Sequence, residues 1–186
     1  SLNNFLDENI IKIEKLNGKF INNVFIIIEH EQIFQTQIGI KKKSYNKNIN
    51  YKALKSLLIE AKELFQKSYK DQKIMHMIIN NYFIDGKNFD HFEKEILAEE
   101  LSLTINFTSI PNSLSHHFEK VLEKYQIRIN KYLDKNYVIN FFQSQKIRFP
   151  VMICKILNGS NLNEVQLVPK INKNKGFFEK FFQLFS

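Results

Sequence analysis

The sequence is poor in the residues and patterns that mark secreted and membrane-spanning proteins. Its single cysteine, Cys154, rules out an internal disulfide and fits a reducing compartment, where we expect a buried structural thiol. No run of about 18 uncharged apolar residues occurs, so no transmembrane helix is expected. The first residues include Asp7 and Glu8 and do not resemble a secretory signal peptide.

Glycine and arginine are also scarce. The five glycines are scattered, and neither G-x-G-x-x-G nor G-x-x-x-x-G-K-[ST] occurs, so no glycine-rich phosphate loop is expected. The formal net charge is +8, but Arg128 and Arg148 are the only arginines. Arginine is the residue that reads guanine and stacks on bases. The charge therefore favours anionic surfaces such as lipid headgroups, and no nucleic-acid partner is expected.

No pattern of titratable residues predicts a catalytic or metal site. His116 and His117 are adjacent, and adjacent helical side chains point about 100° apart, so a helix surface is the better interpretation. His76 lies within an apolar run and is predicted to be a hydrogen-bonded core residue. The acidic groups at 90–93 and 99–100 are predicted to be solvated charges. We expect no enzyme activity, cofactor or bound metal.

The run from Ile74 to Gly86 is predicted to be the buried central strand of the domain. It is apolar except for His76 and the Asn80–Asn81 pair, and Asp85–Gly86 supplies a turn signal at its end. The run is too short to span a membrane and too apolar for a surface loop.

The residues before this strand show clear periodicity. Asn4 to Leu16 predicts an amphipathic helix, and Ile21 to Ile28 predicts a buried strand. Gln32 to Ile40 predicts a second strand, paired with the first as a hairpin. Tyr51 to Phe65 places its apolar residues on one helix face, with Asn50 as the N-cap.

The residues after the central strand give a more varied pattern. Lys87 to Glu100 predicts a polar loop with a short helix, and Leu101 to Thr108 alternates as a half-exposed strand does. Pro111 precedes a helical pattern that continues to Tyr125, and Ile127 to Ile129 predicts a short return strand. Residues 134–170 show no clear pattern and form an uncertain extension of the domain.

The C-terminal residues carry the sharpest pattern in the chain. A basic linker at residues 171–176 precedes residues 177–185, whose apolar side chains fall within about 160° of a helix. These side chains are Phe177, Phe178, Phe181, Phe182, Leu184 and Phe185, with Lys173, Lys175 and Lys180 beside them. A helix this short is marginal in water, and an anionic membrane favours both residue types. We predict a membrane-binding helix; docking on the domain itself or on a partner protein is the alternative.

The order of these elements from Asn9 to Leu133 resembles the SHS2 (1C) subdomain of FtsA, the bacterial actin-like cell-division protein. Ile74–Ile78 and Tyr82–Gly86 resemble the segment of that family in which hydrophobic residues surround a histidine and lead to Tyr-x-hydrophobic-Asp-Gly. Leu101–Phe107 resembles its next strand, and Ser113–Tyr125 its next helix. FtsA also typically ends in a linker and an amphipathic membrane-targeting helix, which the C-terminal residues resemble.

The resemblance implies an α+β fold: a small, mainly antiparallel sheet with helices packed on it (SHS2-like) over residues 1–133, plus the C-terminal amphipathic helix. It implies a peripheral protein at the cytoplasmic face of the bacterial inner membrane that contacts other cell-division proteins or itself. The actin-like lobes do not occur in this sequence, so ATP binding is not carried over and FtsZ tethering stays open. The proline usual in the Asp-Gly strand is replaced around Asn80–Asn81. The alternatives are a soluble interaction module and a basic nucleic-acid-binding domain with Tyr82, Phe83 and Phe107 on one exposed face.

Overall fold

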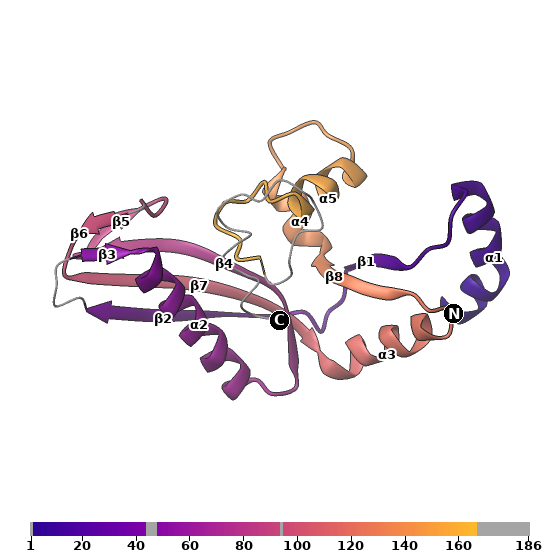
Figure 1. The fold of residues 1–186 in the computed structure, drawn as a ribbon, viewed down its shortest axis with the longest axis horizontal. Coiled ribbons are helices and arrows are strands. Elements are labelled where there is room, and N and C mark those ends of the chain that lie inside the picture. The colour runs from indigo at the N-terminus through magenta and orange to yellow at the C-terminus, as the bar shows by residue number, and fades with distance from the viewer. Residues whose placement is uncertain (1, 44–47, 94, 167–186) are drawn as a thin grey trace.

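The computed structural model describes residues 2–43, 48–93 and 95–166. The fold is α+β, with a mainly antiparallel set of strands and helices packed on it, as predicted. The molecule is elongated, with a four-stranded sheet at one end and a parallel pair of strands toward the other (Figure 1). The predicted linker and terminal helix at residues 171–185 lie outside the described residues.

The predicted helices at residues 4–16, 51–65 and 111–125 are confirmed, with ends shifted by a few residues. The helices are α1 (Leu2–Asn17), α2 (Tyr51–Ser68), α3 (Asn112–Glu123), α4 (Lys135–Phe141) and α5 (Phe149–Leu157). The strands are β1 (Asn23–Ile28), β2 (Phe34–Lys43), β3 (Asn48–Asn50), β4 (Gln72–Ile84), β5 (Lys87–Phe89), β6 (Glu95–Leu97), β7 (Glu100–Pro111) and β8 (Arg128–Asp134).

The larger sheet has the strand order β2-β7-β4-β5 and is antiparallel throughout. The prediction of an internal strand near the middle of the chain is confirmed, since β4 lies between β7 and β5. The turn at Asp85–Gly86 is confirmed as well. Both residues have positive φ, 47° and 78°, which glycine adopts without strain and which aspartate tolerates better than most residues.

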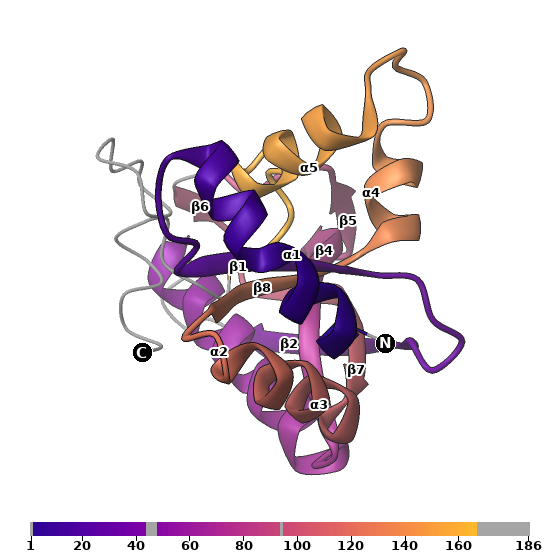
Figure 2. The ribbon, with the colours of Figure 1, turned by 90° about the vertical axis from the view of Figure 1, so that its right-hand side faces the viewer.

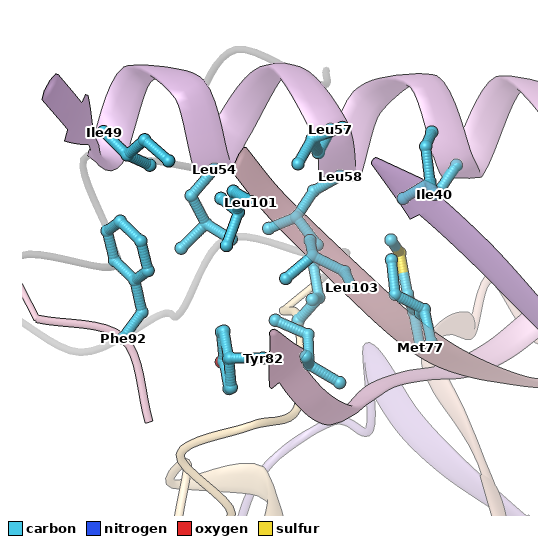
Figure 3. Packing of buried hydrophobic residues seen from close by; sticks show 14 of the residues in the cluster. Ile40, Ile49, Leu54, Leu57, Leu58, Met77, Tyr82, Phe92, Leu101 and Leu103 are labelled. Atoms are coloured by element: carbon cyan, nitrogen blue, oxygen red, sulfur yellow. The ribbon is translucent and has the colours of Figure 1, made fainter. Parts of the chain in front are cut away.

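The main core lies between α2 and one face of this sheet (Figure 3). The side chains of β7 alternate as predicted, with Leu101, Leu103, Ile105 and Phe107 fully buried toward α2. The rings of Phe65 and Phe107 stack with centroids 4.8 Å apart. Burial of each of these apolar side chains is worth about 1.5–3 kcal/mol, so the α2 face accounts for much of the stability of the sheet.

The predicted N-cap of α2 is confirmed. The side chain of Asn50 accepts hydrogen bonds from the backbone amides of Lys52 at 3.0 Å and Ala53 at 3.2 Å. These bonds satisfy two of the amides that a helix leaves without an internal partner at its N-terminus. The start of α2 is therefore fixed by a local interaction of the residue that precedes it.

The predicted hairpin of residues 21–28 with residues 32–40 is wrong. Both strands exist, but β2 pairs antiparallel with β7, and β1 pairs parallel with β8. Figure 2 shows β1 and β8 side by side above α3. The apolar face of β1 packs there with α3, whereas β2 packs under α2, so the two strands serve different cores. Parallel pairing needs a long connection, and sequence proximity does not reveal it.

The structure also tests three smaller predictions: one is confirmed and two are wrong. The described residues 87–93 and 95–100 contain the short strands β5 and β6 and no helix, because β5 pairs with β4 and β6 with β3. The predicted return strand is confirmed and longer, continuing to Asp134 as β8. Cys154 is exposed and not buried, because α5 turns only Ile156 fully inward and Cys154 lies on its outer side. No helix in the described part of the chain is both long and apolar enough to span a membrane.

Candidate functional site

The chain returns to the larger sheet after α5. The backbone N–H of Ile79 donates to the carbonyl of Asn163 at 2.9 Å, and that of Val165 donates to the carbonyl of Met77 at 2.8 Å. Glu164 forms an antiparallel bridge with Ile78 between these two bonds. Residues 163–165, the edge segment, therefore pair with residues 77–79 of β4, in a part of its edge that β5 leaves open.

A buried polar cluster holds the edge segment in place. The Oε1 atom of Glu164 accepts hydrogen bonds from Nδ1 of His76 at 2.9 Å and from Nζ of Lys131 at 2.8 Å. Its Oε2 atom accepts one from the hydroxyl of Tyr137 at 2.9 Å. The Glu164 side chain is 1% exposed and that of Lys131 is 10% exposed. We call these four residues, His76, Lys131, Tyr137 and Glu164, the Glu164 network.

The hydrogen bonds define the protonation state of His76. Its Nε2 atom accepts the backbone N–H of Asp134 at 2.9 Å, so the ring proton is on Nδ1 and is donated to Glu164. Burial lowers the pKa of His76, and the hydrogen bond and charge of Glu164 only partly oppose this. His76 is therefore a neutral, hydrogen-bonded core residue, which confirms its prediction from the sequence.

The charged state of Glu164 follows from its partners. Burial alone would raise the pKa of this carboxyl. The hydrogen bond from His76 and the charge of Lys131 outweigh burial and hold the pKa at about 2. Burial and the Glu164 charge raise the pKa of Tyr137, whose hydroxyl also accepts a bond from Asn161 at 2.9 Å. Glu164 and Lys131 thus form a buried ion pair with neutral donors on either side.

This arrangement is suited to holding a segment rather than to moving protons to a substrate. Both ring nitrogens of His76 and both carboxylate oxygens of Glu164 are already engaged within the protein. The Tyr137 ring packs on the His76 ring with centroids 4.4 Å apart. A general base needs an atom within reach of the proton that it removes. The Glu164 network instead fixes where the chain leaves the sheet at Gln166.

An open pocket of about 490 Å³ lies beside this network, between β2, β7 and α4. Side-chain amides dominate its lining: Gln35, Gln37, Asn106, Asn136 and Asn140. The amide of Gln37 donates to the side-chain oxygen of Asn106 at 2.9 Å. Asp134 also lines the pocket, so the lining combines neutral amides, which both donate and accept, with one carboxyl group.

The residues singled out in the sequence are placed as follows. The predicted membrane-binding residues, Lys173 to Phe185, lie outside the described residues. His116 and His117 are both exposed on α3, and the described residues contain no cluster of three or more metal-ligating side chains. The sequence does not predict the structural role of Glu164, because this residue lies in residues 134–170, which show no clear pattern. The one signal available was His76, whose apolar surroundings imply a buried polar partner.

The aromatic face required by the nucleic-acid alternative is not formed. Tyr82 and Phe107 are buried on the α2 side of the sheet. Phe83 pairs with Ser102 and points to the opposite side, since neighbouring residues of a strand alternate between faces. These three rings therefore do not make one stacking platform.

No protein-family model matches this chain, and no curated protein is significantly similar to it. The resemblance to FtsA rests on sequence motifs alone, above all those at Ile74–Ile78 and Tyr82–Gly86.

Proposed function

We propose that this chain is a protein-interaction domain and that its C-terminal residues attach it to an anionic membrane. In this proposal the chain is a reduced FtsA-like protein at the cytoplasmic face of the bacterial inner membrane. The observation that carries this proposal is the amphipathic pattern of residues 177–185 after a basic linker. Burial of each phenylalanine is worth about 1.5–3 kcal/mol, and each lysine near anionic lipid adds on the order of 1 kcal/mol. Together these terms offset the cost of ordering a short helix.

The described fold supports the proposal by fixing the base of the linker. The edge segment and the Glu164 network hold the chain up to Val165 against β4. Residues 167–176 can span at most about 35 Å when extended. The terminal phenylalanines can thus reach a membrane while the sheet, α2 and α3 remain available to protein partners.

Sedimentation with vesicles tests the membrane attachment. The double variant Phe181→Glu, Phe182→Glu is expected to lose binding to vesicles of phosphatidylethanolamine and phosphatidylglycerol. The matched control Leu16→Glu, Phe20→Glu makes the same change at two strongly exposed apolar positions of the domain and is expected to bind as the wild type does. Pure phosphatidylcholine vesicles should bind the wild type more weakly, because the lysines gain nothing there.

The opposite result would refute the attachment. If the Phe181→Glu, Phe182→Glu variant sediments with anionic vesicles as well as the wild type, the terminal residues are not the anchor. If vesicles also leave the far-UV circular dichroism of the wild type unchanged, the terminal residues serve a protein contact, and the chain is a soluble interaction module.

A further inference from the structure

The strand β2 forms a long, regular edge of the larger sheet. Its 10 residues pair with β7 in continuous antiparallel register, from Phe34 opposite Ser109 to Lys43 opposite Glu100, without a bulge. Within residues 2–43, 48–93 and 95–166, no strand pairs with the other side of β2. About half of its backbone N–H and C=O groups therefore point away from the sheet. The opposite edge of the sheet differs, since β5 pairs with residues 82–84 of β4 and the edge segment with residues 77–79.

The two faces of this edge have different chemistry. On the α2 side, the half-buried Phe34 and Ile38 pack against the core. The helix α2 crosses β2, and its C-terminal end extends past the strand (Figures 1 and 2). Leu64, in this part of α2, is 43% exposed. A strand added beside β2 would therefore meet apolar side chains at Phe34 and Ile38 on the α2 side, and Lys42, which donates to Ser56 at 3.0 Å, near its far end.

The other face of β2 is polar, and its side chains change from neutral to positively charged along the strand. Gln35 and Gln37 line the open pocket between β2, β7 and α4, and Lys41 and Lys43 are exposed at the far end of β2. The Nζ atom of Lys41 lies 3.6 Å from a carboxylate oxygen of Glu100, a loose ion pair. Lysines at a sheet edge oppose unspecific strand pairing. A strand admitted here must therefore carry acidic residues opposite the lysines and neutral polar residues opposite the glutamines.

We propose that β2 binds an extended segment of a partner protein by strand addition. This partner segment alternates apolar residues toward α2 with polar residues on the other face, and its polar residues are acidic where they meet Lys41 and Lys43. The proposal deepens the interaction part of the proposed function and does not depend on the membrane anchor. Backbone bonds supply affinity in this mode, and alternate side chains supply specificity.

The charges argue against the two nearest other occupants. A second copy of β2 offers no carboxylate, because the strand FQTQIGIKKK contains neither Asp nor Glu. The remaining residues of this chain, 167–186, contain Glu179 as their one acidic residue and are themselves basic. Neither can neutralise Lys41 and Lys43 together.

A peptide pair tests the proposal in solution, with the full chain and without lipid. The acidic peptide EVEVSVTVSV and its basic counterpart KVKVSVTVSV are titrated by fluorescence anisotropy. The acidic peptide is expected to bind more tightly. Hydrogen exchange is expected to slow in residues 34–43 when it binds and to stay unchanged in residues 23–28, the edge strand β1. Preference for the basic peptide, no binding of either peptide, or protection elsewhere overturns the proposal.

Two further peptides test the backbone geometry. N-methyl groups are placed on alternate residues of the acidic peptide, on the odd positions in one and on the even positions in the other. Only alternate N–H groups of an added strand face the edge, so one of the two peptides should lose binding and the other should keep it. Equal binding of both, or loss of both, contradicts strand addition.

Charge-reversal variants test the direction of recognition. Lys41→Glu, Lys43→Glu is expected to weaken the acidic peptide about tenfold and to favour the basic one. The control Lys12→Glu, Lys120→Glu has the same net charge change on exposed residues of α1 and α3 and should leave both peptides unaffected. Both variants should bind vesicles alike, so failure here is distinguishable from failure of the membrane proposal. Concentration-dependent protection of residues 34–43 without peptide would overturn the proposal in favour of a second copy.

Discussion

Replacement of Glu164 by alanine should be the most damaging single change in the edge segment beside β4. The carboxylate accepts three hydrogen bonds, from His76 at 2.9 Å, Lys131 at 2.8 Å and Tyr137 at 2.9 Å. Glu164→Ala leaves the largely buried Lys131 ammonium and two further donors without an acceptor. Removal of one member of a buried ion pair costs about 3–5 kcal/mol, and we expect a loss in this range. That is a large fraction of the 5–15 kcal/mol by which a typical domain is stable.

Urea unfolding followed by far-UV circular dichroism at neutral pH measures this loss. The control is Glu29→Ala, which removes a carboxylate that is 59% exposed and paired with Lys135 at the surface. Its cost should be within about 1 kcal/mol, as for other exposed pairs. If Glu164→Ala costs no more than Glu29→Ala, the network does not hold the edge segment, and the reasoning from its geometry is refuted.

The network can also be tested by the coupling between its members. Tyr137→Phe removes only the hydroxyl that donates to Oε2 of Glu164. In a double-mutant cycle with Glu164→Ala, groups in direct contact should show a coupling energy of about 0.5–3 kcal/mol. A coupling near zero would mean that the hydrogen bond contributes nothing measurable.

Three further predictions follow from named groups. Because the pKa of Glu164 is held at about 2, below its ordinary 4.5, its contribution of about 3 kcal/mol should be complete above pH 4.5 and lost as the pH falls toward 2. Burial lowers the pKa of His76 from 6.5, so the free energy of unfolding should also fall as the pH drops below 6.5. Glu164→Ala should flatten the acid limb of the curve of unfolding free energy against pH, and an unchanged limb would contradict this. Asn50→Ala should cost about 1 kcal/mol in urea unfolding, through loss of the α2 cap, whereas Asn50→Ser should restore most of it; equal stability of the two would argue against capping. Cys154 should react with a thiol reagent in the native protein as fast as after unfolding, and protection of the native thiol would show that α5 is covered.

Local patterns were sufficient wherever an element is defined by its own residues. The α2 helix begins at the cap supplied by Asn50, and β7 alternates because one of its faces packs on α2. The Asp85–Gly86 turn ends β4 because aspartate and glycine accept positive φ. The apolar surroundings of His76 predicted a buried, hydrogen-bonded ring. In each case the residues that signal the element lie within or beside it, even where its packing partner is distant in the sequence.

Long-range pairing was not predictable in the same way. The strand β1 is as apolar as a hairpin partner of β2 would be, yet it pairs with β8 at the other end of the domain. The short strands β5 and β6 exist because other strands pair with them, and their own residues resemble a polar loop. The exposure of Cys154 depends on which side of the apolar helix α5 meets the core.

The sequence by itself determined the helices, the alternating strand, the turn and the amphipathic pattern of residues 177–185, because these depend on spacing along the chain. Only the tertiary structure decided which strand edges are covered and which buried charges meet. His76 and Glu164 are 88 positions apart, and nothing in either neighbourhood identifies the other as its partner. They meet because the edge segment pairs with residues 77–79 of β4, where the cost of burying a carboxylate is offset by His76, Lys131 and Tyr137 together. Among the strands of the described residues, the same folding leaves β2 at an edge, a property that belongs to the sheet and not to the strand.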